Sequence, residues 1–437
     1  MCLQINGGRM TLDKSIRILD KILEYSLYGL AFFIPVSIAL TETCTITAIV
    51  TFLLKKILSL KLKPRPERDS TFFSYTNIAL LLFFVSCALS LFNCEPYLSK
   101  GLNALLGKWG KFIMLFWVAG ASLGTGNRLR NICLVFLASG SLVAIDSYIQ
   151  KFFNLEFLLR RPMIPVHYAG RIEYAVTGAF KHSNNLAAYL ICAIPLLAGV
   201  AVAVQQSAGA QKKIRQTLLN AFFLAVILLL TFCLVLTFSR GGWLGFGVAG
   251  SLMLFLLPRK KFVLLLGAAF LILIFSLHGV SERVVATVQS GGDSGRFELW
   301  DGAWAMIAEH PFLGKGVGTF MAFSKDYVPG REPVYAHNFV LQMWAEVGIF
   351  GLLSFLAFVG AVLRGGLLVF LQNKSGKTAP ILAGLLCGAV AFLVQSTLDT
   401  NLYSLQPSTM FWLFLGMIGA LSRPLSTPGL TVETRCR

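Results

Sequence analysis

Long apolar runs without charge recur along the 437-residue chain, and they constrain its fold more than any other feature. Residues 217–238 carry no charged side chain, and residues 338–363 carry a single acid, Glu346. A helix of about 20 apolar residues crosses the ~30 Å hydrocarbon core of a bilayer. Soluble proteins have about 25% charged residues, whereas this chain has 13% charged and 56% hydrophobic residues. The sequence therefore predicts an all-α polytopic membrane protein.

The apolar runs predict about twelve membrane-spanning helices. They lie at about residues 23–40, 43–58, 76–93, 107–124, 130–149, 184–205, 217–238, 241–257, 262–277, 338–363, 379–398 and 408–422. The first twenty residues are polar and basic, so no cleavable signal peptide is expected. We expect three regions: N-terminal spans with the first long loop in residues 1–177, a functional core in residues 178–398, and the last span with a tail in residues 399–437.

Lysine and arginine gather in the short segments between alternate spans. If the N-terminus is cytoplasmic, most of the 38 Lys and Arg residues fall on the inner side, and the positive-inside rule then puts both termini in the cytoplasm. The net charge of +18 therefore indicates membrane orientation and not a nucleic-acid-binding surface. The two longest loops, 150–183 and 278–337, lie on the outer face. They contain all five histidines, namely His167, His182, His278, His310 and His337.

The second outer loop has a helical pattern of its own. Apolar residues recur at helical spacing, at Phe297, Trp300, Trp304 and Ile307. Asp293 or Ser294 is placed to cap a helix that begins near Gly295, and Pro311 follows its expected end. The pattern predicts an amphipathic helix on the outer membrane interface, where tryptophan is favoured.

Two arginines are expected at outward-facing helix N-termini. Arg240 lies in a very short turn between two apolar runs, and Arg296 lies in the first turn of the loop helix. The positive end of a helix dipole disfavours arginine unless an anion lies between them. We therefore predict an anion site, since charges at membrane depth usually have a role. The alternatives are that Arg240 contacts lipid phosphates and that Arg296 pairs with Asp293 or Glu298.

A histidine precedes the tenth expected span, in the segment Tyr335-Ala-His337-Asn338. A neutral imidazole can take a proton from a sugar hydroxyl, and a nearby helix N-terminus favours the neutral form. Tyr335 and Asn338 are candidates for contacts with an acceptor or for structural support. The alternative for His337 is an interfacial histidine that only contacts water.

A further polar segment leads into the sixth span and contains Lys181, His182 and Asn184. Capping by Ser183 or Asn184 explains some of this segment without any function. The sixth, eighth and tenth spans all begin at the outer face, so we expect these groups, Arg240, Arg296 and His337 to converge on a diphosphate. The nine cysteines form no CxxC pair and the histidines no HxxxH pattern, so neither a metal nor a cofactor is predicted.

The ordered set of these motifs resembles the O-antigen ligase and polymerase superfamily of bacterial envelope enzymes. The matching segments are residues 178–188, 238–242, 295–300, 310–318 and 336–351. The resemblance implies a helical fold similar to the GT-C-like glycosyltransferases that use lipid-linked sugars. It also implies transferase activity without a metal, in a bacterial inner membrane, with the active site on the periplasmic face.

The same resemblance implies a substrate pair and roles for the site residues. The donor would be a glycan on undecaprenyl diphosphate, and the acceptor a sugar hydroxyl of lipid A–core in lipopolysaccharide biosynthesis. Arg240 and Arg296, with Lys181 and His182, would bind the diphosphate. His337 would orient or deprotonate the acceptor hydroxyl. Arginine suits this role because it stays charged and binds phosphate oxygens bidentately.

Other functions remain open at this stage. An O-antigen or exopolysaccharide polymerase would use the same donor but a lipid-linked glycan as acceptor. A protein O-glycosyltransferase would modify a protein. A small-anion transporter fits the number of spans, although the chain has no evident half-chain repeat and its polar motifs gather outside the membrane centre.

Overall fold

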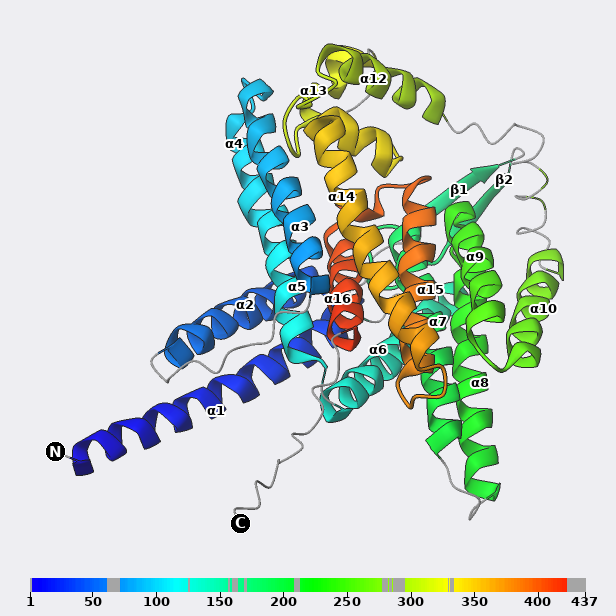
Figure 1. Cartoon of the computed structure of the whole chain (residues 1–437). Coiled ribbons are helices and arrows are strands. Elements are labelled where there is room, and N and C mark those ends of the chain that lie inside the picture. The colour runs from blue at the N-terminus through cyan, green and yellow to red at the C-terminus, as the bar shows by residue number, and fades with distance from the viewer. Residues whose placement is uncertain are drawn as a thin grey trace.

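The computed structural model describes residues 2–60, 71–124, 126–155, 158, 164–168, 171–207, 213–276, 282, 285, 295–328, 330 and 334–422. Most of these residues are helical (Figure 1). The helices of the N-terminal region are α1 (Cys2–Phe33), α2 (Ile38–Leu60), α3 (Thr71–Leu89), η1 (Ser90–Asn93), α4 (Leu98–Asn103), η2 (Ala104–Gly110), α5 (Lys111–Ser122) and α6 (Gly126–Phe153). Those that follow are α7 (Ser183–Ser207), α8 (Lys213–Leu236), α9 (Arg240–Leu256), α10 (Lys260–Ser276), α12 (Arg296–Glu309), α13 (Phe320–Tyr327), α14 (Phe339–Gln372), α15 (Ala379–Ser396), η3 (Asn401–Tyr403) and α16 (Leu405–Leu421).

Eight helical stretches of the described chain are long and apolar enough to cross a membrane. They are Ile38–Leu60, Tyr75–Asn93, Leu98–Ser122, Gly126–Phe153, Ser183–Gln206, Ile214–Leu236, Phe339–Gln372 and Ala379–Ser396. Two shorter apolar helices, α9 and α16, accompany them. The chain is therefore a polytopic helical protein, but the expected number of twelve spans is not confirmed.

The first expected span, 23–40, has wrong boundaries. Helix α1 ends at Phe33 and α2 begins at Ile38, so the break between them lies inside the expected span. Pro35 explains the break, because proline has no N–H to donate and disfavours helical geometry at the residue before it. Helices α1 and α2 pack side by side as a hairpin beside the main bundle (Figure 1).

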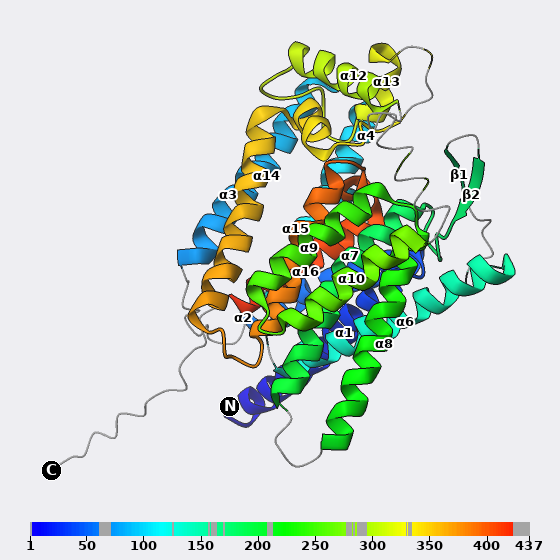
Figure 2. The ribbon, with the colours of Figure 1, turned by 90° about the vertical axis from the view of Figure 1, so that its right-hand side faces the viewer.

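The first long loop contains two strands that the all-α prediction did not include. Strands β1 (Ile164–Tyr168) and β2 (Arg171–Ala175) form an antiparallel pair, with Val166 opposite Glu173. This hairpin projects from the edge of the helical bundle (Figure 2). It is small, so the fold is still dominated by helix packing.

Helix α15 is at the centre of the bundle and packs against α7 and α9, while α16 packs against α5 and α14 against α3. Glycines bring α7 and α15 unusually close together. A Cβ added at Gly199 would lie 2.2 Å from the carbonyl oxygen of Pro380, and one added at Gly384 would lie 2.4 Å from that of Pro195. Small residues allow such close backbone approach between membrane helices, so the later part of α7 is held against the first turns of α15.

Helix α14 is interrupted near its N-terminal end by Gly348, whose φ of 70° and ψ of 178° are not helical. The loop after α12 docks onto this interruption. Ile349 donates its backbone N–H to the carbonyl of Pro311 over 3.0 Å, and Gly316 donates to the carbonyl of Glu346 over 2.9 Å. Gly314, Gly316 and Gly318 all have positive φ, as expected if this glycine-rich segment forms turns. The docking holds α12 and α13 above the end of α14 (Figures 1 and 2).

Candidate functional site

The C-terminal end of α15 contacts the N-terminal ends of α7 and α9. Gln395 donates from Nε2 to the carbonyl oxygen of Asn184 over 3.1 Å. Ser239 caps α9, since its Oγ accepts a hydrogen bond from the N–H of Gly242 at 3.2 Å. A Cβ added at Gly241 would lie 3.2 Å from Cγ of Gln395. Asn184 and Arg240, which come from two different predicted motifs, therefore begin helices at the same end of the bundle.

His337 lies beside an acid from the segment that follows α15. Its Nδ1 is 3.2 Å from Oδ1 of Asp399, and Asp399 also accepts a hydrogen bond from the N–H of Thr400 at 2.7 Å. Asn338 caps α14 by accepting from the N–H groups of Val340 and Leu341. This arrangement matches the tautomer in which Nδ1 carries the proton and Nε2 is free to accept one; the proton position is assigned from the contact.

The backbone of His337 is held in the left-handed region, with φ of 50°. Non-glycine residues adopt this conformation infrequently, and it costs about 1–3 kcal/mol unless the surroundings enforce it. Here the neighbours on both sides are fixed, because Ala336 donates to Oε1 of Gln342 over 3.3 Å and Asn338 forms the helix cap. The imidazole is thus aimed by the backbone as well as by Asp399.

His182 belongs to the same electrostatic group as His337 and Asp399. Partial burial lowers the pKa of His182, and the charges of Lys181 and His337 lower it further, whereas Asp399 acts in the opposite direction. Lys181 and His182 both keep a large part of their surface in contact with solvent. The segment before them is anchored on α6, since Gln150 Oε1 accepts hydrogen bonds from the N–H groups of Thr177 and Gly178.

Arg240 and Arg296 are close enough to repel each other. The guanidinium of Arg240 is partly buried and experiences the positive charge of Arg296, which comes from α12. Two like charges within electrostatic range of each other in a partly buried place raise the free energy of this region. An anion between them would lower it.

Helix α12 is attached directly to the histidine segment. Trp300, one turn after Arg296, donates its indole N–H to the carbonyl oxygen of Ala336 over 3.0 Å. The ring of Tyr335 lies 5.9 Å from that of Tyr403, between centroids. Trp300 therefore ties the helix that begins with Arg296 to the segment that contains His337, and Tyr335 packs against the segment after Asp399.

The expected bounds of α12 are confirmed, but its cap differs. Gly295, with φ of 72°, occupies the N-cap position without a side-chain hydrogen bond, and the expected caps Asp293 and Ser294 lie outside the described residues. Phe297 and Trp304 are exposed whereas Ile307 is buried. The predicted apolar residues therefore lie on both an exposed and a buried side of α12, and their contact with the membrane interface stays a prediction.

A buried polar network lies next to the site. Glu346 of α14 is almost fully buried and accepts hydrogen bonds from the N–H groups of Gly318 at 2.8 Å and Phe320 at 3.3 Å. Lys108, from the π-helical segment η2, donates to the carbonyl oxygen of Tyr403 over 2.9 Å and lies within electrostatic range of Glu346. The network connects α14, the glycine-rich turns and the segment that contains Tyr403.

The structure separates His310 from this group and adds one acid to it. His310 contacts Lys315 instead, at 3.2 Å, and His278 lies outside the described residues. Asp399 is the residue that sequence reasoning missed, although its position at the outer end of an expected span was a usable signal. Among the described residues no three His, Cys, Asp or Glu side chains form a possible metal cluster.

Residues 224–356 match the family described as O-antigen ligase. The chain is 29% identical to the O-antigen ligase of Salmonella typhimurium over 167 residues, which cover 34% of this chain and 41% of that protein. A protein provisionally named a polysaccharide ligase in Rickettsia conorii is 26% identical over 314 residues, covering 64% of this chain and 71% of that protein. A protein with the same provisional name in Rickettsia typhi is 26% identical over 389 residues, covering 78% and 85%. The family match contains Arg240, Arg296 and His337.

Proposed function

We propose that this chain, which belongs to the O-antigen ligase superfamily, transfers a polysaccharide from undecaprenyl diphosphate to a sugar hydroxyl of lipid A–core. The observation that supports the proposal most directly is that a pair of arginines and a histidine–aspartate pair occur at one end of the bundle. Arg240 experiences the charge of Arg296, and His337 lies 3.2 Å from Asp399. The first suits an anionic leaving group, and the second suits proton removal from an acceptor.

The two arginines would hold the diphosphate. Their mutual repulsion is relieved when a group with several negative charges lies between them, and each guanidinium can form two parallel hydrogen bonds to phosphate oxygens. The same contacts stabilise the charge that develops on the diphosphate as its bond to the sugar breaks. Lys181 and His182 would extend this cationic surface.

His337 would act as the general base. Its Nε2 takes the proton of the acceptor hydroxyl while that oxygen attacks C1 of the donor sugar, and the C1–O bond to the diphosphate breaks. Undecaprenyl diphosphate leaves with the electron pair of that bond. Asp399 keeps the proton on Nδ1 and stabilises the imidazolium that forms. Asn184, Asn338 and Tyr335 support the helix ends around the acceptor.

The proposal includes the membrane arrangement. The site would face the periplasm, both termini the cytoplasm, and the protein would lie in the bacterial inner membrane. Residues 178–398 would form the catalytic core, with a fold related to the GT-C-like glycosyltransferases and no metal requirement. The core would be flanked by an N-terminal region of residues 1–177 and a C-terminal region of residues 399–437.

The test is transfer in vitro with a defined lipid-linked donor and lipid A–core as acceptor. We expect His337→Ala and Arg296→Ala to abolish transfer while thermal unfolding remains cooperative. Arg130→Ala is the matched control, because Arg130 is exposed and donates a hydrogen bond to neighbouring Asn131. Full activity of both site variants would contradict the residue roles. Elongation of lipid-linked repeats without transfer to lipid A–core would indicate a polymerase instead.

A further inference from the structure

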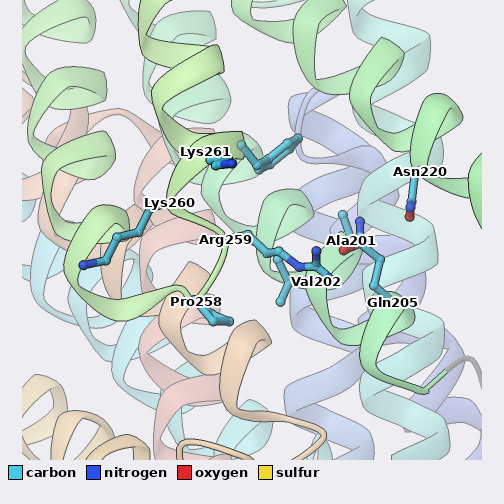
Figure 3. A pocket seen from close by; sticks show the side chains of 9 residues that line it. Ala201, Val202, Gln205, Asn220, Pro258, Arg259, Lys260 and Lys261 are labelled. Atoms are coloured by element: carbon cyan, nitrogen blue, oxygen red, sulfur yellow. The ribbon is translucent and has the colours of Figure 1, made fainter.

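A cavity of about 530 Å³ lies at the end of the bundle opposite His337. It is lined by the C-terminal portion of α7, by α8 and by the turn between α9 and α10 (Figure 3). Helix α7 begins next to His182, and Ala201 is 18 residues beyond its first residue, Ser183. At 1.5 Å per residue this is about 27 Å, the thickness of a bilayer core. The cavity therefore lies at the opposite membrane face from the candidate active site.

The polar lining of this cavity has one sign of charge. Three consecutive cations, Arg259, Lys260 and Lys261, border it, and Gln205 and Asn220 add neutral hydrogen-bonding groups. None of the nine lining residues is acidic. The positive-inside rule accounts for cations in a short turn, but it does not account for a cavity beside them. The combination is typical of a site for a phosphate-containing headgroup.

The remaining lining of the cavity is apolar. Ala201 and Val202 are buried at one side of it, and Phe262 contributes an aromatic wall. Helices α8 and α10, which border the cavity, also expose large apolar side chains, among them Leu218 of α8 and Leu264 of α10. A ligand with a charged headgroup and apolar tails matches this lining, whereas a free anion would leave the apolar portion uncovered.

A second cavity of about 230 Å³ shares Pro258 and Lys260 with the first. It adds Lys374 and Phe370 from the C-terminal end of α14. The cations thus lie around the α9–α10 turn, with a cavity on each side. Lys260 therefore borders both cavities.

We propose that this double cavity binds the headgroup of an anionic membrane phospholipid in the leaflet opposite the candidate active site. Arg259, Lys260 and Lys261 contact its phosphate, Gln205 and Asn220 contact its polar substituents, and its acyl chains lie along α8 and α10. The inference is independent of the proposed transferase activity. It also gives α9 an attachment to lipid at the end opposite Arg240.

Lipid binding to the purified full chain in neutral detergent tests this proposal. Phosphatidylglycerol and phosphatidylcholine are titrated separately, and bound lipid is counted by native mass spectrometry. The test variant is R259Q/K260Q/K261Q. The control is K14Q/R17Q/K21Q, which removes the same charge from exposed positions of α1. Each basic residue near an anionic lipid contributes about 1 kcal/mol, or about fivefold in affinity. We therefore expect the test variant to bind phosphatidylglycerol at least about tenfold more weakly, and the control to change less than about twofold.

A second variant keeps the proposal testable if the triple substitution disturbs folding. Ala201→Leu narrows the cavity without changing any charge, and it should also weaken phosphatidylglycerol binding selectively. Equal losses of phosphatidylglycerol binding in the test triple and the control triple would overturn the lipid site. So would undiminished binding in both the Ala201→Leu variant and the test triple. Displacement of the lipid by inorganic phosphate alone would assign the cations to a free anion and would also refute the proposal.

Discussion

Asp399 and His337 are 62 residues apart in the chain, yet Oδ1 of the acid lies 3.2 Å from Nδ1 of the imidazole. The side chain of Asp399 is 8% exposed and that of His337 is 34% exposed. The carboxylate is therefore the buried partner, and the imidazole is the partner that solvent reaches. A group in this position fixes the tautomer and orientation of a catalytic histidine without touching the substrate.

Asp399→Asn should therefore reduce transfer with little loss of stability. Asparagine can present its amide NH₂ to Nδ1, which favours the wrong tautomer and removes the negative charge. We expect the rate at saturating donor and acceptor to fall about 100-fold, at the lower end of the roughly 10²–10⁴-fold that general-base catalysis contributes. Asp326→Asn, at an exposed acid on α13, should leave the rate unchanged. A wild-type rate for Asp399→Asn would show that the pair has no catalytic role.

The hydrogen bond from Trp300 to Ala336 predicts a joint effect on stability and activity. Trp300→Phe keeps the aromatic ring but loses the N–H donor, at a cost of about 0.5–1.5 kcal/mol. Because this bond ties the helix of Arg296 to the segment of His337, transfer should fall several-fold. Trp304→Phe is the control, since Trp304 is half exposed. The measurements are the unfolding midpoints and initial transfer rates of both variants. Equal midpoints and equal rates for Trp300→Phe and Trp304→Phe would contradict a positioning role for Trp300.

The sequence predicted well those features that depend on local pattern. The expected spans 184–205 and 241–257 correspond closely to α7 and α9, and the loop helix begins and ends within one residue of its expected limits. Apolar periodicity and helix-end chemistry operate over a few neighbouring residues, so one sequence contains them.

The features that failed depend on contacts between distant segments. Asp399 was not chosen, because its position at the end of an expected span does not by itself indicate that it meets His337. The interruption at Gly348 was also missed, since a single glycine in an apolar run predicts no break until the loop that docks against it is known. The closeness of Arg240 and Arg296 was expected only from shared orientation relative to the membrane.

The loss of stability on replacing the buried Glu346 should depend on how many of its interactions the new side chain keeps. Glu346→Ala removes the acceptor for the N–H groups of Gly318 and Phe320 and the attraction for Lys108. We expect a loss of about 3–5 kcal/mol, the usual cost of breaking a buried charge pair. Glu346→Gln keeps an acceptor oxygen and should cost less. Adding Lys108→Met to Glu346→Gln should restore some of the stability in thermal unfolding. A further loss in the double variant would mean that the two charges do not interact.

Gly348 should tolerate no side chain. A Cβ at this position would lie 1.9 Å from the carbonyl oxygen of Phe312, and its φ of 70° is unfavourable for other residues. Gly348→Ala should therefore displace the loop that carries α12 and cost several times the roughly 1 kcal/mol of backbone strain alone. Gly360→Ala, on the same helix with no atom within 4 Å of the added Cβ, should be neutral or stabilise by up to about 1 kcal/mol. Expression yield and unfolding midpoints of the two variants provide the comparison.

The lowered pKa of His182 predicts the direction of a pH effect. In the unfolded chain His182 has an ordinary pKa of about 6.5, so below that pH the unfolded state takes up a proton before the folded state does. Stability that depends on His182 is therefore fully present above pH ~6.5 and is lost as the pH falls toward the lower folded pKa. His182→Gln should match the wild type in thermal unfolding at alkaline pH and become relatively more stable under acid conditions.

Donor binding should reverse this trend, because a diphosphate beside His182 favours the protonated imidazole. Thermal stabilisation by the lipid-linked donor should therefore increase as the pH falls in the wild type and increase less in His182→Gln. His310→Gln serves as the control, since His310 also has a lowered pKa but contacts Lys315 away from the candidate site. Its pH dependence of stability should change with the same sign, while its response to donor should not. A donor response in His182→Gln equal to that of the wild type would remove His182 from the diphosphate site.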